Sequence, residues 1–575
     1  MHSRFWNSCT SRLRSGRVLS WSGLCGGGAT RVFMPVALLL LFACRDETVG
    51  PSPEVNFSRA ESAASKPETI RPAEQYLFDV AETAPSFGGL WMDEKGTVHV
   101  WVAEAADETA ARRAVELLFA TGRLAQNANS VFRGIAIHRG AYSVGQLARW
   151  RDLAFDAMNR DETLKIASLD LDERLNRVRV GVLPNESKAS VRSALVLLGL
   201  DADAIRLEEQ DSDMELTSAS TTAIPPTIVA QADTIVGGLG MTFSGANDDV
   251  PFLCTLGFVA MLSSGPRLVT GSHCSTTVWG VDGSRFRNAP QGRLIAYETY
   301  DAAGYDCGFR TCRGSDAGMS EFYPGIASLV GLIARLQHLD SPTFDLSINQ
   351  SNPYWMVADV ENNNMYPGFH LYKVGQTTGW VTATVTNTCD DYRPQSSNRT
   401  VTCQVDAQGG VQGGDSGGPL FWIKPPTTYQ VVLAGITVAR GGSGNIIFSP
   451  FQRIAANTGL TRLDVIHPSL FLGQPVVTGS VNAGYPQLTW PAVPWATSYS
   501  LYRAWYNYYT EEGSNGYEYV GSVAAPFLDS FPVDLYTGTS VPNFSTHGYV
   551  AYYLVAHNAN TSSAPSQVKY FRYAP

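Results

Sequence analysis

The chain lacks the features that mark nucleotide-binding, nucleic-acid-binding and zinc-binding proteins. It contains no P-loop, no Rossmann fingerprint and no base-stacking motif. Its formal net charge is −10, which argues against non-specific binding to a phosphate backbone. No closely spaced pair of Cys or His residues stands opposite a second pair, as the ligands of a structural zinc ion do. The sequence therefore predicts no cofactor, no metal and no nucleic-acid partner.

Long apolar runs are also scarce. The run Val32 to Ala43, which follows Arg31, is too short for a mature transmembrane helix, and no other apolar run reaches that length. It ends in Leu-Phe-Ala-Cys at Cys44, which is similar to a bacterial lipobox. We therefore predict a lipoprotein-type signal peptide over 1–44 and an exported chain, either anchored by lipid at Cys44 or secreted after processing. An ordinary secretory signal with a cysteine at its cleavage site is the alternative.

One short motif points to nucleophilic catalysis. Gly414 to Pro419 reads Gly-Asp-Ser-Gly-Gly-Pro. A serine hydroxyl is a poor nucleophile, so it needs a base to take its proton and N–H donors for the oxyanion that forms. Glycines around Ser416 allow the tight turn that directs successive N–H groups to one point. A glycine-rich turn with an incidental serine is the alternative unless partner residues are present.

Partner residues precede this motif in a defined order. Leu268 to Cys274 is an apolar strand end that carries His273, and Cys312 to Met319 places Asp316 at the head of a small, apolar run. The order His, Asp, Ser is one of several that reach the geometry of a catalytic triad. Residues 235–466 accordingly resemble chymotrypsin-fold serine proteases, and in detail the bacterial streptogrisin and α-lytic branch. The motifs that carry this resemblance are Ile235-Val236-Gly237-Gly238, Thr270 to Cys274, Lys373 to Gly379 with its Thr-Thr-Gly element, and Gly414 to Pro419.

The resemblance implies a role for each residue of the site. Ser416 would attack the scissile carbonyl, His273 would take and return the proton, and Asp316 would hold the imidazole in its working tautomer. The N–H groups of Gly414 and Ser416 match the oxyanion hole of the family. Asp301 and Asp306 lie on the same segment as Asp316 and are the alternatives for the acid. Asp316 fits the family pattern better because it leads directly into a small, apolar strand.

A buried ion pair is expected beside the serine. Trypsin-like enzymes pair the acid before the serine with a freed amino terminus, but Thr234 before Ile235 offers no tryptic cleavage site. The bacterial branch uses an internal basic residue just before the Thr-Thr-Gly element, and Lys373 occupies that position. The resemblance therefore implies a buried Lys373–Asp415 pair. A surface lysine is the alternative, because the family more often shows arginine there.

The chain has nine cysteines, and their use fits an oxidising compartment. The spacing of the last six suggests three disulfides, although six cysteines allow fifteen connectivities. The suggested pairs are Cys254–Cys274, Cys307–Cys312 and Cys389–Cys403. The first pair matches the family bridge that anchors the catalytic histidine, and the other two rest on proximity in the sequence alone.

The resemblance also bears on the substrate, which we expect to be a protein or peptide. In trypsin-like enzymes an acid a few residues before the serine selects Arg or Lys, whereas Gly410 stands there in this chain. The pocket wall after the serine is similar to Thr437-Val438-Ala439. We therefore expect a neutral, apolar specificity pocket that accepts small or medium side chains. An esterase acting on non-peptide acyl groups is the closest enzymatic alternative.

The length of 575 residues requires several domains. Residues 45–75 are predicted to be a disordered linker, and 211–234 a linker with a processing site. Residues 76–210 alternate strands and helices, and their position is similar to the α/β pro-region of α-lytic-type proteases, an intramolecular chaperone and inhibitor; a substrate-binding module is the alternative. The predicted elements are strands over 96–102, 131–138 and 178–182, and helices near 107–122, from Ser143, and from Ser187 to Leu198. Gly88-Gly89-Leu90-Trp91 is expected to precede the first of these strands.

Composition shifts again after Pro468. Residues 467–575 contain alternating strands with Trp and Tyr and resemble a fibronectin type III β-sandwich. The overall prediction is thus a multidomain, mainly β chain with a double antiparallel β-barrel at its centre. Aromatics of the sandwich are expected in its core. Alternatively Trp505, Tyr506, Tyr508 and Tyr509 are exposed and bind a polymer or a cell surface, in which case the protein is an adhesin with a vestigial protease domain.

Overall fold

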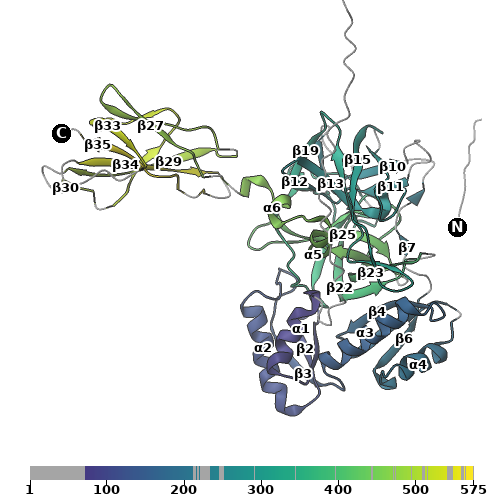
Figure 1. Ribbon diagram of the computed structural model, residues 1–575. Helices are drawn as coiled ribbons and strands as arrows, with labels where there is room; N and C mark the ends of the chain where they lie inside the picture. Colours follow the sequence, from purple (N-terminus) through teal and green to yellow (C-terminus); the bar gives the residue numbers. More distant parts are fainter. Residues whose placement is uncertain are drawn as a thin grey trace, which may run out of the picture. The chain divides into compact units, whose positions relative to one another are not determined.

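A computed structural model of the chain confirms the expected fold class, which is multidomain and mainly β (Figure 1). It describes residues 72–573 apart from 185, 211–214, 217–218, 221–233, 245–251, 290–291, 343–344, 395–396, 442–443, 471, 473, 494, 508–511, 515, 540–547, 559–561 and 564. Cys44, the predicted signal peptide, Tyr508 and Tyr509 therefore lie outside the described residues. Within these ranges no helix is long and apolar enough to cross a membrane.

Residues 72–209 contain two α/β units of the same build. Each unit has an antiparallel strand pair followed by a helix and a strand parallel to the second of the pair. The first unit comprises β1 (Phe87–Met92), β2 (Thr97–Val102), α2 (Glu108–Ala120) and β3 (Gly134–Arg139). The second comprises β4 (Ile166–Asp172), β5 (Arg177–Val182), α4 (Lys188–Leu197) and β6 (Ile205–Glu209). Helices α1 (Gln75–Thr83) and α3 (Val144–Arg160) complete this N-terminal region.

The capping residues expected from the sequence are in place. The side chain of Ser143 accepts a hydrogen bond from the N–H of Gln146 and so begins α3, and Ser187 begins α4 in the same way. Gly88 to Trp91 precede the strand predicted over 96–102, which is β2, and they form a strand of their own, β1, that was not predicted. The strand register shifts at Gly88, and Gly89 has a φ of +128°, so the two glycines accommodate a bulge that other residues would not.

The central region, residues 234–466, which we call the barrel, supplies most strands of two sheets. The first is antiparallel throughout, with strand order β12-β13-β18-β15-β14-β10-β11-β8. Its strands are β8 (Ala219–Ser220), β10 (Gly240–Ser244), β11 (Phe252–Thr255), β12 (Phe258–Leu262), β13 (Gly265–Gly271), β14 (Arg285–Asn288), β15 (Leu294–Asp301) and β18 (Ala317–Phe322). Apolar residues of this sheet share a core cluster with residues of the second sheet, among them Phe258, Leu268, Phe421 and Ile436.

The second sheet is larger and includes β4, β5 and β6 of the N-terminal region. Its remaining strands are β7 (Glu215–Leu216), β9 (Thr234–Gly237), β16 (Tyr305–Asp306), β17 (Thr311–Arg313), β19 (Ala327–Ala334), β20 (Tyr354–Val360), β21 (His370–Gly375), β22 (Gly379–Tyr392), β23 (Arg399–Gly409), β24 (Pro419–Ile423), β25 (Gln430–Arg440) and β26 (Ile446–Pro450). Helices α5 (Phe451–Thr458) and α6 (Arg462–Val465) follow. The long hairpin β22–β23 is the part of this sheet that meets the N-terminal region, through antiparallel pairing of β22 with β4.

A buried ionic cluster lies beside this β4–β22 pairing. The guanidinium of Arg179 contacts Asp390, and its Nη2 lies 3.8 Å from both Asp170 and Asp406. Its Nε lies 4.0 Å from Asp172. We call these five residues the Arg179 cluster. Burial raises the pKa of all four carboxyls, and that of Asp170 reaches about 7.

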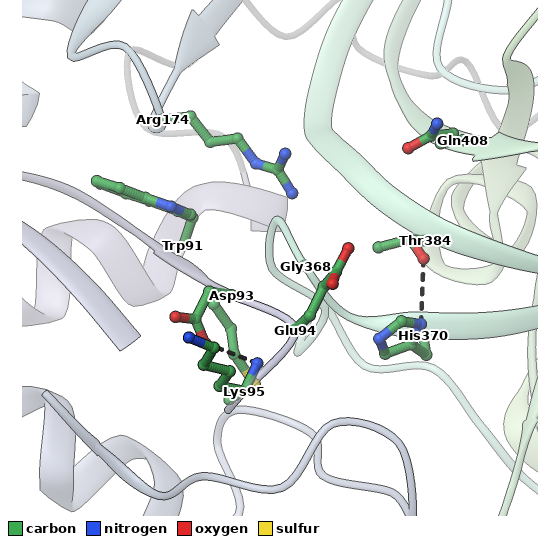
Figure 2. Close-up of a pocket in the computed structure, with 10 residues that line it drawn as sticks. Trp91, Asp93, Glu94, Lys95, Arg174, Gly368, His370, Thr384 and Gln408 are labelled. Carbon is green, nitrogen blue, oxygen red and sulfur yellow. Dashed lines mark hydrogen bonds between the residues drawn. The ribbon is translucent and has the colours of Figure 1, made fainter. Parts of the chain in front are cut away.

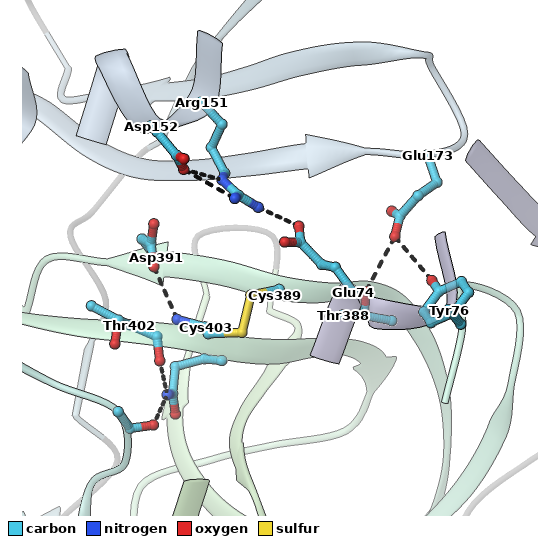
Figure 3. The surroundings of a disulfide bond; sticks show 12 residues. Glu74, Tyr76, Arg151, Asp152, Glu173, Thr388, Cys389, Asp391, Thr402 and Cys403 are labelled. Carbon is cyan, nitrogen blue, oxygen red and sulfur yellow. Dashed lines mark hydrogen bonds and ion pairs between the residues drawn. A yellow bond between two sulfur atoms is a disulfide. The ribbon is translucent and has the colours of Figure 1, made fainter. Parts of the chain in front are cut away.

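Further buried contacts join the same two regions (Figure 3). Glu173, which follows β4, accepts hydrogen bonds from Tyr76 at 3.2 Å and from Thr388 of β22 at 3.1 Å. Within the N-terminal region, the fully buried Arg151 pairs with Glu74. The hydroxyl of Thr388 thus gives the buried Glu173 a polar partner in the barrel, in addition to the apolar core that the two regions share.

The C-terminal region is a β-sandwich with its own core. One sheet contains β27 (Thr478–Asn482), β28 (Tyr485–Thr489) and β32 (Phe527–Leu528). The other contains β29 (Ser498–Asn507), β30 (Glu512–Gly513), β31 (Glu518–Ser522), β33 (Val533–Gly538), β34 (Tyr549–His557) and β35 (Lys569–Tyr573). Trp490 and Tyr552 are buried, and the half-buried Trp505 packs on Phe531 with ring centroids 5.7 Å apart. Tyr506 is also half-buried. Trp505 and Tyr506 therefore fit a place against the core better than an exposed row of side chains that binds a polymer.

Candidate active site

Two neighbouring strands of the first sheet carry His273 and Asp316. Strand β13 ends at Gly271 and leads into a single 3-10 turn, Ser272–Cys274, which holds His273. Asp316 stands immediately before β18, whose Ala317 pairs with Gly271. The N–H of Ser272 donates to the carbonyl of Asp316 at 3.0 Å. Strand pairing therefore brings the imidazole and the carboxylate to the same edge of the sheet.

Ser416 comes from the second sheet, on the loop between β23 and β24. Gly414 and Gly417 have φ values of +98° and +82°, which favour glycine. A Cβ at Gly417 would lie 2.1 Å from Thr270 Oγ1, so no larger residue fits there. The N–H of Thr255 donates to the carbonyl of Ser416 at 2.7 Å. The loop is thereby held against the first sheet.

The three side chains expected to form the triad meet. His273 Nε2 lies 2.6 Å from Ser416 Oγ, and His273 Nδ1 contacts Asp316 Oδ2. All three residues are buried; Ser416 is 0% and His273 4% exposed. Burial alone would raise the pKa of Asp316, but the charge and hydrogen bond of His273, with the charge of Arg313, outweigh it and lower that pKa. Asp316 is thus held ionised beside the imidazole.

The two alternative acids lie elsewhere. The Oδ1 of Asp301 pairs with the buried Arg313 at 2.5 Å, and its Oδ2 accepts a hydrogen bond from Ser272 Oγ at 2.6 Å. Asp306 is exposed in β16 and accepts from the N–H of Gly308 at 2.9 Å. Asp316 is therefore the carboxylate that contacts His273.

The expected ion pair beside the serine is present. Lys373 Nζ lies 2.6 Å from Asp415 Oδ2, and both side chains are 0% exposed. Asp415 also accepts from the N–H groups of Thr377, Thr378 and Gln412 at 2.9–3.0 Å, and from the hydroxyl of Thr378 at 2.7 Å. Burial lowers the pKa of Lys373, and the nearby charge of Asp415 offsets this only in part. Five donors on one carboxylate fix the backbone on both sides of Gly414 and Ser416.

The residues expected to form the oxyanion hole and the specificity pocket differ in burial and in their contacts with Ser416. Gly414 and Ser416 flank Asp415 in the tight loop, as an oxyanion hole built from their N–H groups requires. Val438 carbonyl oxygen lies 3.4 Å from Ser416 Oγ, whereas Thr437 directs its hydroxyl to the Gly418 carbonyl at 3.0 Å. Val438 and Ala439 pack in an apolar cluster, and Gly410 is exposed. Their part in side-chain selection stays a prediction.

All three suggested disulfides are formed. They are Cys254–Cys274, Cys307–Cys312 and Cys389–Cys403. The first ties β11 to the residue after His273, and the third lies at the β22–β23 hairpin beside the N-terminal region (Figure 3). The first therefore braces a segment next to the site, and the third braces one next to the contact with the N-terminal region.

One donor to the site was not predicted. The indole N–H of Trp279 donates to Asp316 Oδ1 at 3.1 Å. No motif marks Trp279, because its contact depends on how the turn after His273 folds back. The only available signal was a tryptophan, which has one N–H to satisfy when buried, in the segment between His273 and Asp316.

A cavity of about 410 Å³ lies away from the triad (Figure 2). It is lined by Trp91, Asp93, Lys95 and Arg174 on the N-terminal side, and by His370, Thr384 and Gln408 of the barrel among others. Burial lowers the pKa of His370. The cavity contains none of the triad residues. In the part of the chain that is described, no group of His, Cys, Asp and Glu is arranged to hold a metal ion.

Comparison with known proteins adds little beyond this geometry. No protein-family model matches the chain, and no curated protein matches it. Among solved structures it is similar to Thermobifida fusca Protease A, with 22% identity, 40% of this chain and 99% of that chain covered, and a TM-score of 0.28. It is also similar to an alpha-lytic protease homolog, N4, with 18% identity, 40% and 98% coverage and a TM-score of 0.28. The MamO protease domain from Magnetospirillum magneticum, in its apo form, matches with 14% identity, 39% and 95% coverage and a TM-score of 0.23. At these values the likeness carries no argument about activity.

Proposed function

We propose that the chain is a serine endopeptidase that hydrolyses peptide bonds through an acyl-enzyme intermediate. The observation that carries this proposal is the continuous contact from Ser416 Oγ to His273 Nε2 and from His273 Nδ1 to Asp316. A hydroxyl, an imidazole and an ionised carboxylate in this order are an arrangement that activates serine for nucleophilic acyl transfer. The tight loop that presents Ser416 also carries the N–H groups that an oxyanion needs.

The reaction proceeds in two balanced halves. Ser416 Oγ attacks the substrate carbonyl carbon while its proton passes to His273 Nε2, and the carbonyl oxygen becomes an oxyanion near the N–H groups of Gly414 and Ser416. The C–N bond then breaks, and the leaving amine takes the proton from His273. Water repeats the sequence on the ester and releases the acid and free Ser416. Asp316 stays ionised and stabilises the imidazolium that forms in each half.

The test uses a fluorophosphonate probe on the full chain. We expect the probe to label Ser416, peptide-library substrates to be cleaved, and Ser416→Ala to lose both. Ser320→Ala, a buried serine elsewhere in β18, is the matched control and should keep both. Cleavage of acyl esters without any peptide cleavage would indicate an esterase. Absence of labelling in a folded chain that has been freed of its N-terminal region would favour an adhesin with a vestigial protease domain.

We further propose that the enzyme is made as a self-processing precursor. Strand β7, in the linker after the N-terminal region, pairs antiparallel with Ala439 and Arg440 of β25, directly beyond Val438. Strand β8 pairs antiparallel with Phe252 and Leu253 of β11, just before the Cys254 that is bonded to Cys274. A peptide substrate adds to a strand edge in the same way. Since β7 and β8 lie on the two strands that flank Ser416, the proposed cleavage falls between Leu216 and Ala219.

Mass spectrometry of the mature enzyme tests this cleavage site. We expect an amino terminus between residues 217 and 219 in the wild-type chain and an intact linker in Ser416→Ala. A mature terminus elsewhere, or cleavage that persists in Ser416→Ala when the chain is made in a protease-deficient host, would contradict self-processing at this site. Because the peptide-library assay is independent of the linker, failure here would not overturn the endopeptidase proposal.

The N-terminal region is proposed to act as intramolecular chaperone and inhibitor. Its strand β4 extends the sheet of the barrel at β22, and it shares an apolar core with the barrel. A barrel rich in non-local strand pairing folds slowly, because distant strands must be brought together before they gain contacts. A strand edge that is already formed reduces the conformational entropy that the barrel still has to lose. We expect a chain lacking 76–210 to yield no active enzyme, and co-expression of 76–210 to restore activity. Full activity without that region would contradict the chaperone role.

Export and surface attachment complete the proposal. Lipidation at Cys44 would anchor the precursor, and cleavage in the linker would release the protease. We expect Cys44→Ala to move the precursor from the membrane fraction to the medium, and an unchanged distribution would contradict lipidation.

The C-terminal sandwich is proposed to be a fibronectin type III-like accessory module, and pull-down of the full chain on insoluble polymers or cell envelopes tests whether it binds a surface.

A further inference from the structure

Each oxygen of the Asp316 carboxylate has its own hydrogen-bond partner. Its Oδ2 contacts His273 Nδ1, and its Oδ1 accepts the indole N–H of Trp279 at 3.1 Å. Asp316 is 1% and Trp279 9% exposed, so neither oxygen can rely on bulk water as its partner. An indole nitrogen only donates. Trp279 therefore fixes Oδ1 as an acceptor and leaves Oδ2 turned to the imidazole.

The backbone of Trp279 is held in a conformation that a bulky residue rarely adopts. Its φ is +59°, in the left-handed region. Its N–H donates to Ser272 Oγ at 2.9 Å, and Ser272 Oγ donates to Asp301 Oδ2 at 2.6 Å. The N–H of Gly280 donates to the same Asp301 oxygen at 2.9 Å. This network begins at the residue next to His273, so the turn that positions the imidazole also positions the indole.

The ring of Trp279 is fixed independently of its N–H. Arg313 and Arg399 place their guanidinium carbons 5.6 Å and 5.5 Å from the ring centroid. The ring also packs in one apolar cluster with Val438 and Tyr392. Cation–π contacts of this kind hold the plane of an aromatic ring. A strained backbone that is over-determined by its surroundings is typical of functional sites.

We propose that Trp279 is a positioning residue of the hydrolytic reaction, whose indole N–H orients the Asp316 carboxylate toward His273. This inference rests on the proposed endopeptidase function. Trp279 touches neither the substrate nor Ser416 in this role and acts only through Asp316. Phenylalanine at this position keeps an aromatic ring near the two guanidinium groups and removes the donor, so the two contributions of Trp279 can be separated.

The donor also affects the charge on Asp316. The groups that face this carboxylate are His273 from the 3-10 turn, Arg313 from β17, Asp301 from β15 and the Trp279 indole. Burial raises the pKa of Asp316, and the charge of His273, the charge of Arg313 and the Trp279 N–H together lower it below the usual value. Removing the N–H raises this pKa. Without this donor more of the negative charge of Asp316 faces His273 Nδ1, which favours the imidazolium over the free base that takes the Ser416 proton, so the acidic limb of the activity profile should move to higher pH.

The experiment compares Trp279→Phe with Trp355→Phe in the full chain. Trp355 is a matched control, because it is also buried, at 1% exposed, and the guanidinium carbon of Arg335 lies 4.1 Å from its ring centroid. Its indole N–H, however, has no hydrogen-bond partner among the described residues. Loss of one hydrogen bond to a charged group predicts a fall in kcat of about 10- to 100-fold in Trp279→Phe. We expect KM to stay within about twofold, and the acidic limb for fluorophosphonate labelling of Ser416 to move to higher pH. Trp355→Phe should show neither change.

The outcomes are distinct. A folded Trp279→Phe with wild-type kcat and an unmoved acidic limb would overturn the positioning role, as would the same losses in Trp355→Phe. A wild-type chain that neither cleaves peptides nor reacts with the probe would instead refute the endopeptidase proposal. If Trp279→Phe does not fold, 3-benzothienylalanine at position 279 keeps the bicyclic shape without the N–H, and the same two readouts apply.

Discussion

Replacing Lys373 by methionine tests the ion pair beside the nucleophile most directly. Methionine fills much of the same space but leaves Asp415 charged in a site that is 0% exposed. Breaking a buried pair by removing one partner costs about 3–5 kcal/mol. Asp415 keeps four of its donors, the N–H groups of Thr377, Thr378 and Gln412 and the Thr378 hydroxyl. We therefore expect the lower end, about 3 kcal/mol, which raises the unfolded fraction of this loop about 100-fold.

The assay has to report on this loop, because a multidomain chain does not unfold in two states. We would measure fluorophosphonate labelling of Ser416 against urea concentration, with calorimetry as a second readout. Asp415→Asn and the double variant Lys373→Met/Asp415→Asn complete a cycle. The double variant removes both charges, so it should lose less stability than the two single variants added together. A loss below about 1 kcal/mol in Lys373→Met, or strict additivity in the cycle, would refute the reasoning.

Three further predictions concern other parts of the molecule. Cys274→Ala opens a disulfide that spans 20 residues and should lower the free energy of unfolding around the site by about 3 kcal/mol; an unchanged urea midpoint for Ser416 labelling would contradict this. In the Arg179 cluster, burial raises the pKa of Asp170 to about 7 from its usual 3.8, so docking of the N-terminal region should be strongest below pH 3.8 and weaken as pH rises through about 7. Retention of the cleaved N-terminal region on gel filtration should be greater at pH 5 than at pH 8, and equal retention would count against it. Burial likewise raises the pKa of Glu361 to about 7, so Glu361→Gln should raise the melting temperature of the barrel at pH 8 but not at pH 5, and a rise of equal size at both would show that charge is not the cause.

Residues that act through their near neighbours in sequence could be predicted. The loop around Ser416, the strand end before His273 and the basic residue before the Thr-Thr-Gly element each carry their chemistry within a few positions. Cys307 and Cys312 are close enough in the chain that proximity alone pairs them. Helix starts at Ser143 and Ser187 follow from capping, which is also a local effect.

Contacts that depend on tertiary structure could not be predicted in this way. Strand β4 reads Ile-Ala-Ser-Leu-Asp-Leu-Asp, and the alternation from Ser168 to Asp172 suggests a strand with one face in solvent, yet every position of β4 is buried. Its acidic residues Asp170 and Asp172 argued against a buried strand, and they become tolerable only through Arg179 on β5. Strands β7 and β8 have only two residues each and form on edges supplied by distant strands. Trp279 reaches Asp316 only because its turn folds back on the strand end.

The Arg179 cluster affects how readily the two regions rejoin after they separate. Arg179 belongs to the N-terminal region, whereas Asp390 and Asp406 belong to the barrel. When the regions part, both barrel carboxylates lose Arg179 as a neighbour and become hydrated. Recapture would then require stripping that hydration from two anions that repel each other. Redocking would therefore carry a desolvation cost that shifts the balance toward the separated regions once the linker has been cut.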